Sequence, residues 1–117
     1  MKTRLTHVRI NVRDLQAAID WYREMLGYEV RNTWPPEEPN YADFAPAQGA
    51  SFSLMVADPV PTGGRCNFSV EDVDALWEKL KDRVDVVEPL FETAYGSRKF
   101  TIRDLDGNEL GFVADPS

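Results

Sequence analysis

The feature that most constrains this sequence is an internal repeat. Asp14 and Asp72 both stand at the start of an amphipathic helical pattern, and Gly49 and Gly107 stand in later turns at the same offset of 58 residues. The other matches at this offset are Val12 with Val70, Ala17 with Ala75, and Asp20 with Glu78. Matches that recur at one fixed spacing indicate a supersecondary unit that occurs twice. We therefore expect two copies of one module.

Hydropathy patterns predict the same element order in both copies. Apolar and polar residues alternate in the strand patterns, while helical spacing follows the N-cap residues Asp14 and Asp72, with Gly27 at the end of the first helix. The predicted strands cover residues 6–12, 28–34, 41–45, 51–57, 65–70, 84–91, 97–103 and 109–114. The order β-α-β-β-β in each copy predicts a single α+β domain at 1–117, with modules at about 4–57 and 64–115 and a linker at 58–63.

Composition and charge exclude several classes of partner. With 13 Lys and Arg against 20 Asp and Glu, the chain carries a net charge of −7. Nucleic acids and anionic membranes are bound largely through Lys and Arg, so neither is an expected partner. No apolar run reaches the ~20 residues that span a bilayer, and the residues after Met1 lack the pattern of a signal peptide. We expect a cytoplasmic protein.

The chain has one cysteine and one histidine. Cys66 by itself forms neither an internal disulfide nor a thiolate zinc site. Its place on the apolar side of a predicted strand indicates a buried core thiol. His7 is the residue that any histidine-dependent catalysis or metal binding in this chain must use.

Three segments carry a resemblance to a known family. They read HVRINVRDL at 7–15 with WY at 21–22 and LGYEV at 26–30, then FSVEDVD at 68–74, then YGSRKF at 95–100 with DLDGN at 104–108. In this order and spacing they resemble the vicinal-oxygen-chelate superfamily of glyoxalases, extradiol dioxygenases and bleomycin-resistance proteins. The third segment is most similar to bleomycin-resistance-type members. The resemblance implies two βαβββ modules that form a curled mixed sheet around a ligand cup.

The resemblance also implies where a metal ion would bind. Metal-dependent members place ligands on the first and fourth strands of each module, and the matching residues here are His7, Ser53, Arg65 and Gly111. Catalytic metal sites use imidazole, carboxylate or thiolate ligands, and only His7 is one of these. We therefore expect no metal and no other cofactor. The alternative is a metal-dependent glyoxalase-type lyase or isomerase, or a dioxygenase, that uses His7 and Glu109, because Glu109 shares the strand face of Gly111.

Alternation gives the first strand of each module one polar and one apolar face. The polar faces hold His7, Arg9, Asn11, Arg65, Asn67 and Ser69. The apolar faces, which we expect to meet the helices, hold Val8, Ile10, Val12, Cys66, Phe68 and Val70. Polar side chains are costly in a dry core, so the polar faces are expected to line a wet ligand cup. An open sheet that exposes them to bulk solvent is the alternative.

Aromatic and basic residues complete the expected ligand site. Trp34 precedes two prolines, where a stiff loop can hold its ring against a flat ligand, while ordinary core packing is the alternative for Phe44. The arginines favour an anionic or carbonyl-bearing ligand and the acidic surface favours a cationic one, so the sign of the ligand's charge stays open. The expected ligand-binding residues are His7, Arg9, Trp34, Tyr41, Phe44, Ser53, Arg65, Asn67, Tyr95, Arg98 and Gly111.

These observations predict a metal-free small-molecule-binding protein rather than an enzyme. By similarity to bleomycin-resistance-type members, we expect a homodimer that sequesters a drug-like or aromatic metabolite in the crevice between subunits, with antibiotic resistance as the implied role. Besides the metal-dependent enzyme, a second alternative is a metal-free enzyme with His7 as general base, because imidazole transfers protons at neutral pH.

Overall fold

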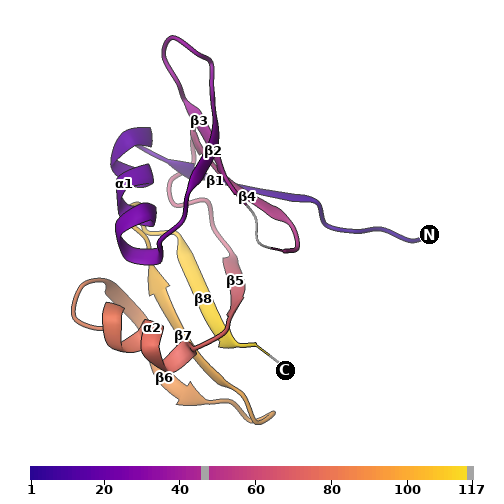
Figure 1. The fold of residues 1–117 in the computed structure, drawn as a ribbon, viewed down its shortest axis with the longest axis vertical. Helices are drawn as coiled ribbons and strands as arrows, with labels where there is room; N and C mark the ends of the chain where they lie inside the picture. The colour runs from indigo at the N-terminus through magenta and orange to yellow at the C-terminus, as the bar shows by residue number, and fades with distance from the viewer. Residues whose placement is uncertain (46–47, 116–117) are drawn as a thin grey trace. The chain divides into compact units, whose positions relative to one another are not determined.

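The computed structural model describes residues 1–45 and 48–115 (Figure 1). The chain divides into two compact units, Met1–Thr62 and Gly63–Ser117. Unit 1 holds β1 (His7–Val12), α1 (Leu15–Leu26), β2 (Val30–Trp34), β3 (Tyr41–Phe44) and β4 (Ser51–Val56). Unit 2 holds β5 (Arg65–Val70), α2 (Val73–Leu80), β6 (Asp85–Glu92), β7 (Arg98–Arg103) and β8 (Glu109–Ala114). This order confirms the predicted α+β class with two βαβββ modules.

Each unit contains one four-stranded mixed sheet. The strand order is β1-β4-β3-β2 in unit 1 and β5-β8-β7-β6 in unit 2. The pairs β1–β4 and β5–β8 are parallel, and the other pairs are antiparallel. A parallel pair needs a long crossover connection, which here consists of the helix and the two strands between the paired strands. The crossover brings His7 beside Ser51, which follows it by 44 residues.

The repeat extends to the strand register. His7 lies opposite Ser51 in the first parallel pair, and Arg65 lies opposite Glu109 in the second. Arg65 follows His7 by 58 residues, and Glu109 follows Ser51 by the same number. The antiparallel pairs agree in the same way, Tyr41 with Met55 in unit 1 and Lys99 with Val113 in unit 2. Equivalent positions of the two units can therefore be compared residue by residue.

Both helices begin at the predicted N-cap residues. The side chain of Asp14 accepts a hydrogen bond from the Ala17 N–H at 3.0 Å, and Asp72 accepts one from Ala75 at the same distance. Gly27 ends α1 with a φ of 72°, a conformation that glycine adopts without strain. Helix α1 packs on β3 and β4, and α2 packs on β7 and β8. Neither helix of the described chain has the length and apolar character needed to cross a membrane.

The helix-covered face of each sheet carries an aromatic core. In unit 1 the Tyr22 ring is fully buried, and its centroid lies 5.5 Å from that of Phe44 and 5.6 Å from that of Phe52. In unit 2 the buried Phe100 ring lies 5.3 Å from Trp77 of α2. These clusters occupy one side of each sheet and leave the other side to polar residues.

Two side chains lie elsewhere than the sequence predicted. Phe44 was an expected ligand contact, but it is 3% exposed in the core of unit 1. Alternation places it on the same side of β3 as the buried Ala42, so it faces α1. Cys66 was expected to be fully buried and is only half-buried, because β5 is an edge strand with a neighbour on one side.

Candidate functional site

The site in unit 1 stands on the side of the sheet that α1 leaves uncovered. We call this side the polar face of unit 1. It carries His7 and Arg9 from β1, Ser51, Ser53 and Met55 from β4, Tyr41 and Asp43 from β3, and Asn32 and Trp34 from β2. Of these, Trp34 is the most exposed large apolar side chain, at 64%.

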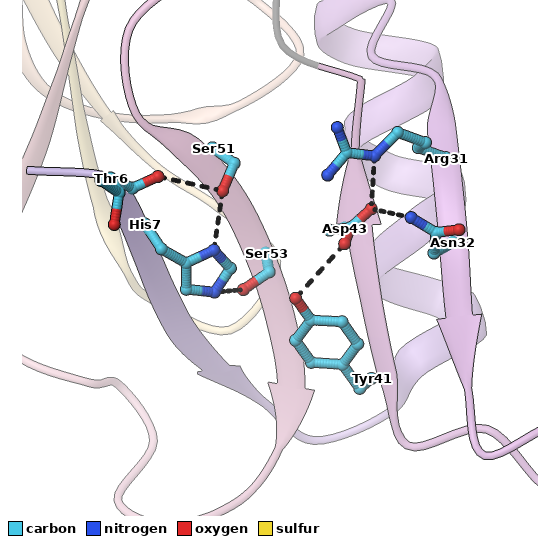
Figure 2. Close-up of polar contacts among 8 residues, drawn as sticks. All are labelled: Thr6, His7, Arg31, Asn32, Tyr41, Asp43, Ser51 and Ser53. Atoms are coloured by element: carbon cyan, nitrogen blue, oxygen red, sulfur yellow. Dashed lines mark hydrogen bonds and ion pairs between the residues drawn. The ribbon is translucent and has the colours of Figure 1, made fainter.

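The His7 ring is held between two serine hydroxyls (Figure 2). Its Nδ1 lies 2.7 Å from Ser51 Oγ and its Nε2 lies 2.8 Å from Ser53 Oγ. Ser53 is fully buried, and the two hydroxyls each lie 3.3 Å from a backbone carbonyl oxygen, of Thr6 and Val8 respectively. A neutral imidazole has one N–H, so it donates to one serine and accepts from the other. The sheet thus sets the position of the ring.

Tyr41 lies beside His7, with ring centroids 6.4 Å apart and ring planes inclined by 26°. Figure 2 shows the two rings side by side across β4. The Tyr41 hydroxyl donates to Asp43 Oδ2 at 3.4 Å, and Asp43 Oδ1 accepts from Arg31 Nε at 3.3 Å and Asn32 Nδ2 at 3.2 Å. Asp43 therefore orients the phenol ring. We call the two rings the His7–Tyr41 platform.

The other two polar residues of β1 make different contacts. Arg9 places its Nη1 3.0 Å from the Met55 sulfur. Asn11 donates its backbone N–H to Thr62 Oγ1 at 2.6 Å and its side-chain amide to the Pro59 carbonyl at 3.0 Å. Asn11 thus ties the segment 59–62 to an edge strand, which is a structural role.

On the corresponding face of unit 2, Arg65 stands at the position of His7. Its Nε and Nη2 donate to Glu109 Oε1 at 3.0 and 2.9 Å, and its Nη1 donates to Glu88 Oε1 at 3.2 Å. Thr101 also donates its hydroxyl to Glu88 at 3.0 Å. The hydrogen bond to Glu109 holds the pKa of Arg65 above its usual value. Glu109, the alternative metal ligand, is therefore engaged by a permanent cation.

Gly111 and Asn67 lie opposite each other in the β5–β8 pair. The Asn67 side-chain oxygen stands where a β-carbon at position 111 would lie, and Lys99 Cε would be 3.3 Å from that carbon. The missing side chain at Gly111 therefore makes room for Asn67, and the two residues pack on each other.

Besides Phe44, two expected site residues lie apart from the polar faces. Tyr95 is in the turn between β6 and β7 and is 74% exposed. Arg98 Nε donates to Asp74 Oδ1 of α2 at 2.9 Å. Arg98 shares the side of β7 that holds the buried Phe100, so it lies on the helix side of the sheet and not on the ligand side where we expected it.

Several contributors to these faces were not predicted from the sequence, namely Ser51, Asp43, Arg31, Asn32 and Glu88. Alternation was a sufficient signal for three of them, because Ser51 stands two residues before Ser53, Asp43 two residues after Tyr41, and Asn32 two residues before Trp34. Glu88 had no such signal. The pairing of β6 with β7 shifts register on both sides of Glu88, so simple alternation does not predict the face on which its side chain lies.

The donor set does not fit a divalent metal ion. Within residues 1–45 and 48–115, no three His, Cys, Asp or Glu side chains lie close enough to hold one. Of the four positions implied by the resemblance, His7 has both ring nitrogens on serines, and Ser53 is one of those serines. Arg65 is an ion-paired cation and Gly111 has no side chain.

An open pocket of about 330 Å³ lies at the far end of β1. Its lining residues are Val12, Arg13, Val56, Ala57, Asp58 and Val60. Val12 follows His7 by five residues, roughly 16 Å along a strand, so this pocket is separate from the His7–Tyr41 platform. The lining includes no aromatic side chain, and we place the candidate site on the polar face of unit 1.

Comparison with known proteins agrees with this architecture. Residues 4–112 match the family model described as Glyoxalase/Bleomycin resistance protein/Dioxygenase superfamily. No curated protein matches the chain.

Solved structures of similar fold include a member of the glyoxalase/bleomycin resistance protein/dioxygenase superfamily from Sphaerobacter thermophilus DSM 20745, at a TM-score of 0.80 and 23% identity over 97% of this chain and 98% of that one. TioX from Micromonospora sp. ML1 has a TM-score of 0.78 and 21% identity over 96% and 98%. A lactoylglutathione lyase from Agrobacterium tumefaciens has a TM-score of 0.76 and 21% identity over 97% and 95%. At these identities the likeness is one of fold.

Proposed function

The chain belongs to the Glyoxalase/Bleomycin resistance protein/Dioxygenase superfamily, and from this premise we propose that it binds a flat small organic molecule without a metal ion. The observation that carries the proposal is the His7–Tyr41 platform. Both rings are held by hydrogen bonds to side chains of the sheet, and the His7 residue is exposed while Tyr41 is half-buried.

A ring platform that is oriented before the ligand arrives lowers the entropic cost of binding. Offset stacking on an aromatic ring contributes about 0.5–1.5 kcal/mol beyond the area that it buries. Trp34 lies opposite Tyr41 at the end of β2 and adds an exposed aromatic side chain on the same face. These features favour a drug-like or metabolite ligand with a planar ring.

The metal-free part of the proposal rests on what occupies the expected ligand positions. Arg65 and Glu109 neutralise each other at 2.9 Å. Recruiting Glu109 to a metal would place a divalent cation beside the Arg65 guanidinium and remove the closer of its two carboxylate partners, which is unfavourable. His7 would likewise have to give up a serine hydrogen bond.

We also propose that the protein is a cytoplasmic homodimer that sequesters its ligand, as in a resistance role. Each sheet ends in strands that pair on one side within their own unit, which are β1 and β2 in unit 1 and β5 and β6 in unit 2. Open strand edges are surfaces that proteins cover or pair. A second copy of the chain would enclose more of a ligand than one polar face does.

The test uses a neutral planar probe, 1-naphthalenemethanol, titrated into the protein and followed by calorimetry. Tyr41→Leu should weaken binding by up to about tenfold, because it removes one ring of the platform. Phe91→Leu is the matched control, since it removes an exposed ring from β6 and should leave the affinity unchanged. Equal affinities for wild type and Tyr41→Leu would contradict the proposal.

The same protein is used to test whether the chain binds a metal ion and needs it to bind the probe. Native mass spectrometry after incubation with zinc, nickel, manganese or ferrous ions should show no stoichiometric metal, and probe affinity should be the same before and after treatment with EDTA. A bound metal whose removal abolishes probe binding would overturn the metal-free assignment, and Glu109→Gln would then be the first variant to examine.

A further inference from the structure

The arginines in the strands differ in whether they pair with a carboxylate. Five arginines lie in the strands of the described chain, and four of them pair with a carboxylate. The pairs are Arg31 with Asp43 at 3.3 Å, Arg65 with Glu109 at 2.9 Å, Arg98 with Asp74 at 2.9 Å and Arg103 with Asp85 at 3.2 Å. Arg9 has no carboxylate partner among the described residues, and its contact is the Met55 sulfur at 3.0 Å.

An arginine without a carboxylate partner is notable in a chain where acidic residues outnumber basic ones, with 20 Asp and Glu against 13 Lys and Arg. A thioether is a weak hydrogen-bond acceptor, and a guanidinium has five N–H donors. The contact with Met55 therefore positions the Arg9 side chain but leaves its charge and most of its donors available. The guanidinium fork matches a carboxylate in two parallel hydrogen bonds.

Arg9 stands next to the His7–Tyr41 platform. It follows His7 by two residues on the same side of β1, which separates their α-carbons by roughly 7 Å. Its partner across the β1–β4 pair is Ser53, the residue that holds His7 Nε2. Met55, which Arg9 contacts, lies directly opposite Tyr41 in the β3–β4 pair. The guanidinium is thus held at the border of the platform.

The nearby acid does not neutralise this charge. Asp43 lies on the same face, but its oxygens accept from Arg31, Asn32 and Tyr41. In unit 2 the position equivalent to Arg9 is Asn67, a neutral side chain. An arginine at this position of the first strand is therefore particular to unit 1.

We propose that Arg9 anchors a carboxylate of the ligand whose ring lies on the His7–Tyr41 platform. The inference rests on the proposed function and adds the sign of the ligand's charge, because it selects planar acids over neutral and cationic analogues. The contact is a charge-assisted hydrogen bond at an exposed edge, so it should be sensitive to salt.

The test compares three probes with one ring system and different charge: 1-naphthoate, 1-naphthalenemethanol and 1-naphthylmethylammonium. Wild type should bind the carboxylate about tenfold more tightly than the alcohol, and the ammonium least. Arg9→Gln should bring the carboxylate and the alcohol to similar affinity, while Arg9→Lys should retain part of the preference. Arg103→Gln removes a paired arginine of unit 2 and should preserve the full preference.

The outcomes separate this inference from the proposed function. If wild type binds the alcohol through Tyr41 but shows no preference for the carboxylate, or if Arg9→Gln keeps that preference, the role of Arg9 is refuted and the platform stands. If wild type binds none of the three probes, both proposals fail. Circular dichroism of Arg9→Gln checks that this exposed substitution leaves the fold intact.

Discussion

Single residues decide the chemistry of the two sheets. At equivalent positions of the parallel strand pairs, His7 contacts two serine hydroxyls through hydrogen bonds, while Arg65 contacts two glutamates through ion pairs. The backbone register at these positions is the same. The difference between a ring held by serine hydroxyls and a cation paired with carboxylates is therefore a matter of side-chain identity, not of fold.

Ser53 should contribute measurably to stability because its hydroxyl is fully buried and holds His7. Ser53→Ala should lower the free energy of unfolding by about 1 kcal/mol, the usual net value of one hydrogen bond. Urea denaturation measures this loss. Ser69→Ala, at an exposed position of β5, serves as the control and should change stability by less than about 0.5 kcal/mol. Equal effects of the two substitutions would contradict a structural role for Ser53.

Cys66 should make stability fall in alkaline solution. Burial raises the pKa of its thiol, and the charge of Asp104 acts in the same direction. The folded protein therefore keeps this proton at pH values where the unfolded chain has lost it. The free energy of unfolding is thus unaffected below the pKa of the unfolded thiol and decreases as the pH rises from there toward the folded pKa.

Two measurements check this expectation for Cys66. The rate of reaction with Ellman's reagent should reach half its maximum at a higher pH in the folded protein than in urea-unfolded protein. The alkaline loss of stability should also be smaller in Cys66→Ser. The same midpoint in folded and unfolded protein would show that the half-buried position leaves the thiol unperturbed.

At the scale of elements, local sequence signals were sufficient to place a helix where its N-cap residue, its hydrophobic periodicity and its C-terminal glycine agree. Helix α1 begins after Asp14 and ends at Gly27, as predicted. Strand β2 was expected from residue 28 but begins at Val30. Tyr28 donates its backbone N–H to the Tyr22 carbonyl at 3.4 Å, so it belongs to the C-terminal cap of α1 and not to the strand. The helix cap at Gly27 therefore moved this boundary.

The two N-caps should be equivalent in energy because they are copies of one feature. Asp14→Ala and Asp72→Ala should each lower the free energy of unfolding by about 1 kcal/mol. Chemical denaturation of both variants measures these losses. Glu71→Ala removes an exposed acid beside the second cap and controls for the change in charge. A cap variant as stable as Glu71→Ala would mean that the hydrogen bond to Ala17 or Ala75 contributes nothing.

At the scale of the whole molecule, the repeat is the organising feature. An offset of 58 residues relates the caps, the strand pairs and their registers. The superfamily assignment predicted from the sequence is confirmed by the family model over residues 4–112. The finer resemblance to bleomycin-resistance-type members stays a prediction, as does the homodimer.

Oligomeric state gives a direct prediction at this scale. Native mass spectrometry at micromolar concentration should show a species of twice the chain mass of 13.3 kDa. The expectation follows from the unpaired edges of the two sheets. Light scattering after size exclusion provides an independent mass. A monomer by both methods would leave the polar face of unit 1 to bind its ligand without a second subunit and would contradict the dimer crevice.

Local patterns in the chain were enough to establish the element order, the helix caps, the duplicated module and the superfamily. Each of these depends on residues a few positions apart or on a fixed offset along the chain. Alternation also placed His7, Arg9 and Arg65 on polar strand faces, as the sheets now show.

Which polar residues meet was decided only by the tertiary structure. The parallel pairs join strands 44 residues apart, and they bring Ser53 to His7 and Glu109 to Arg65. Side-chain pairing across such separations depends on register and on which acid reaches which base, and the local pattern contains neither. For this reason the sequence offered several arginines as equal candidates, whereas the folded chain pairs all of those in strands except Arg9 among its described residues.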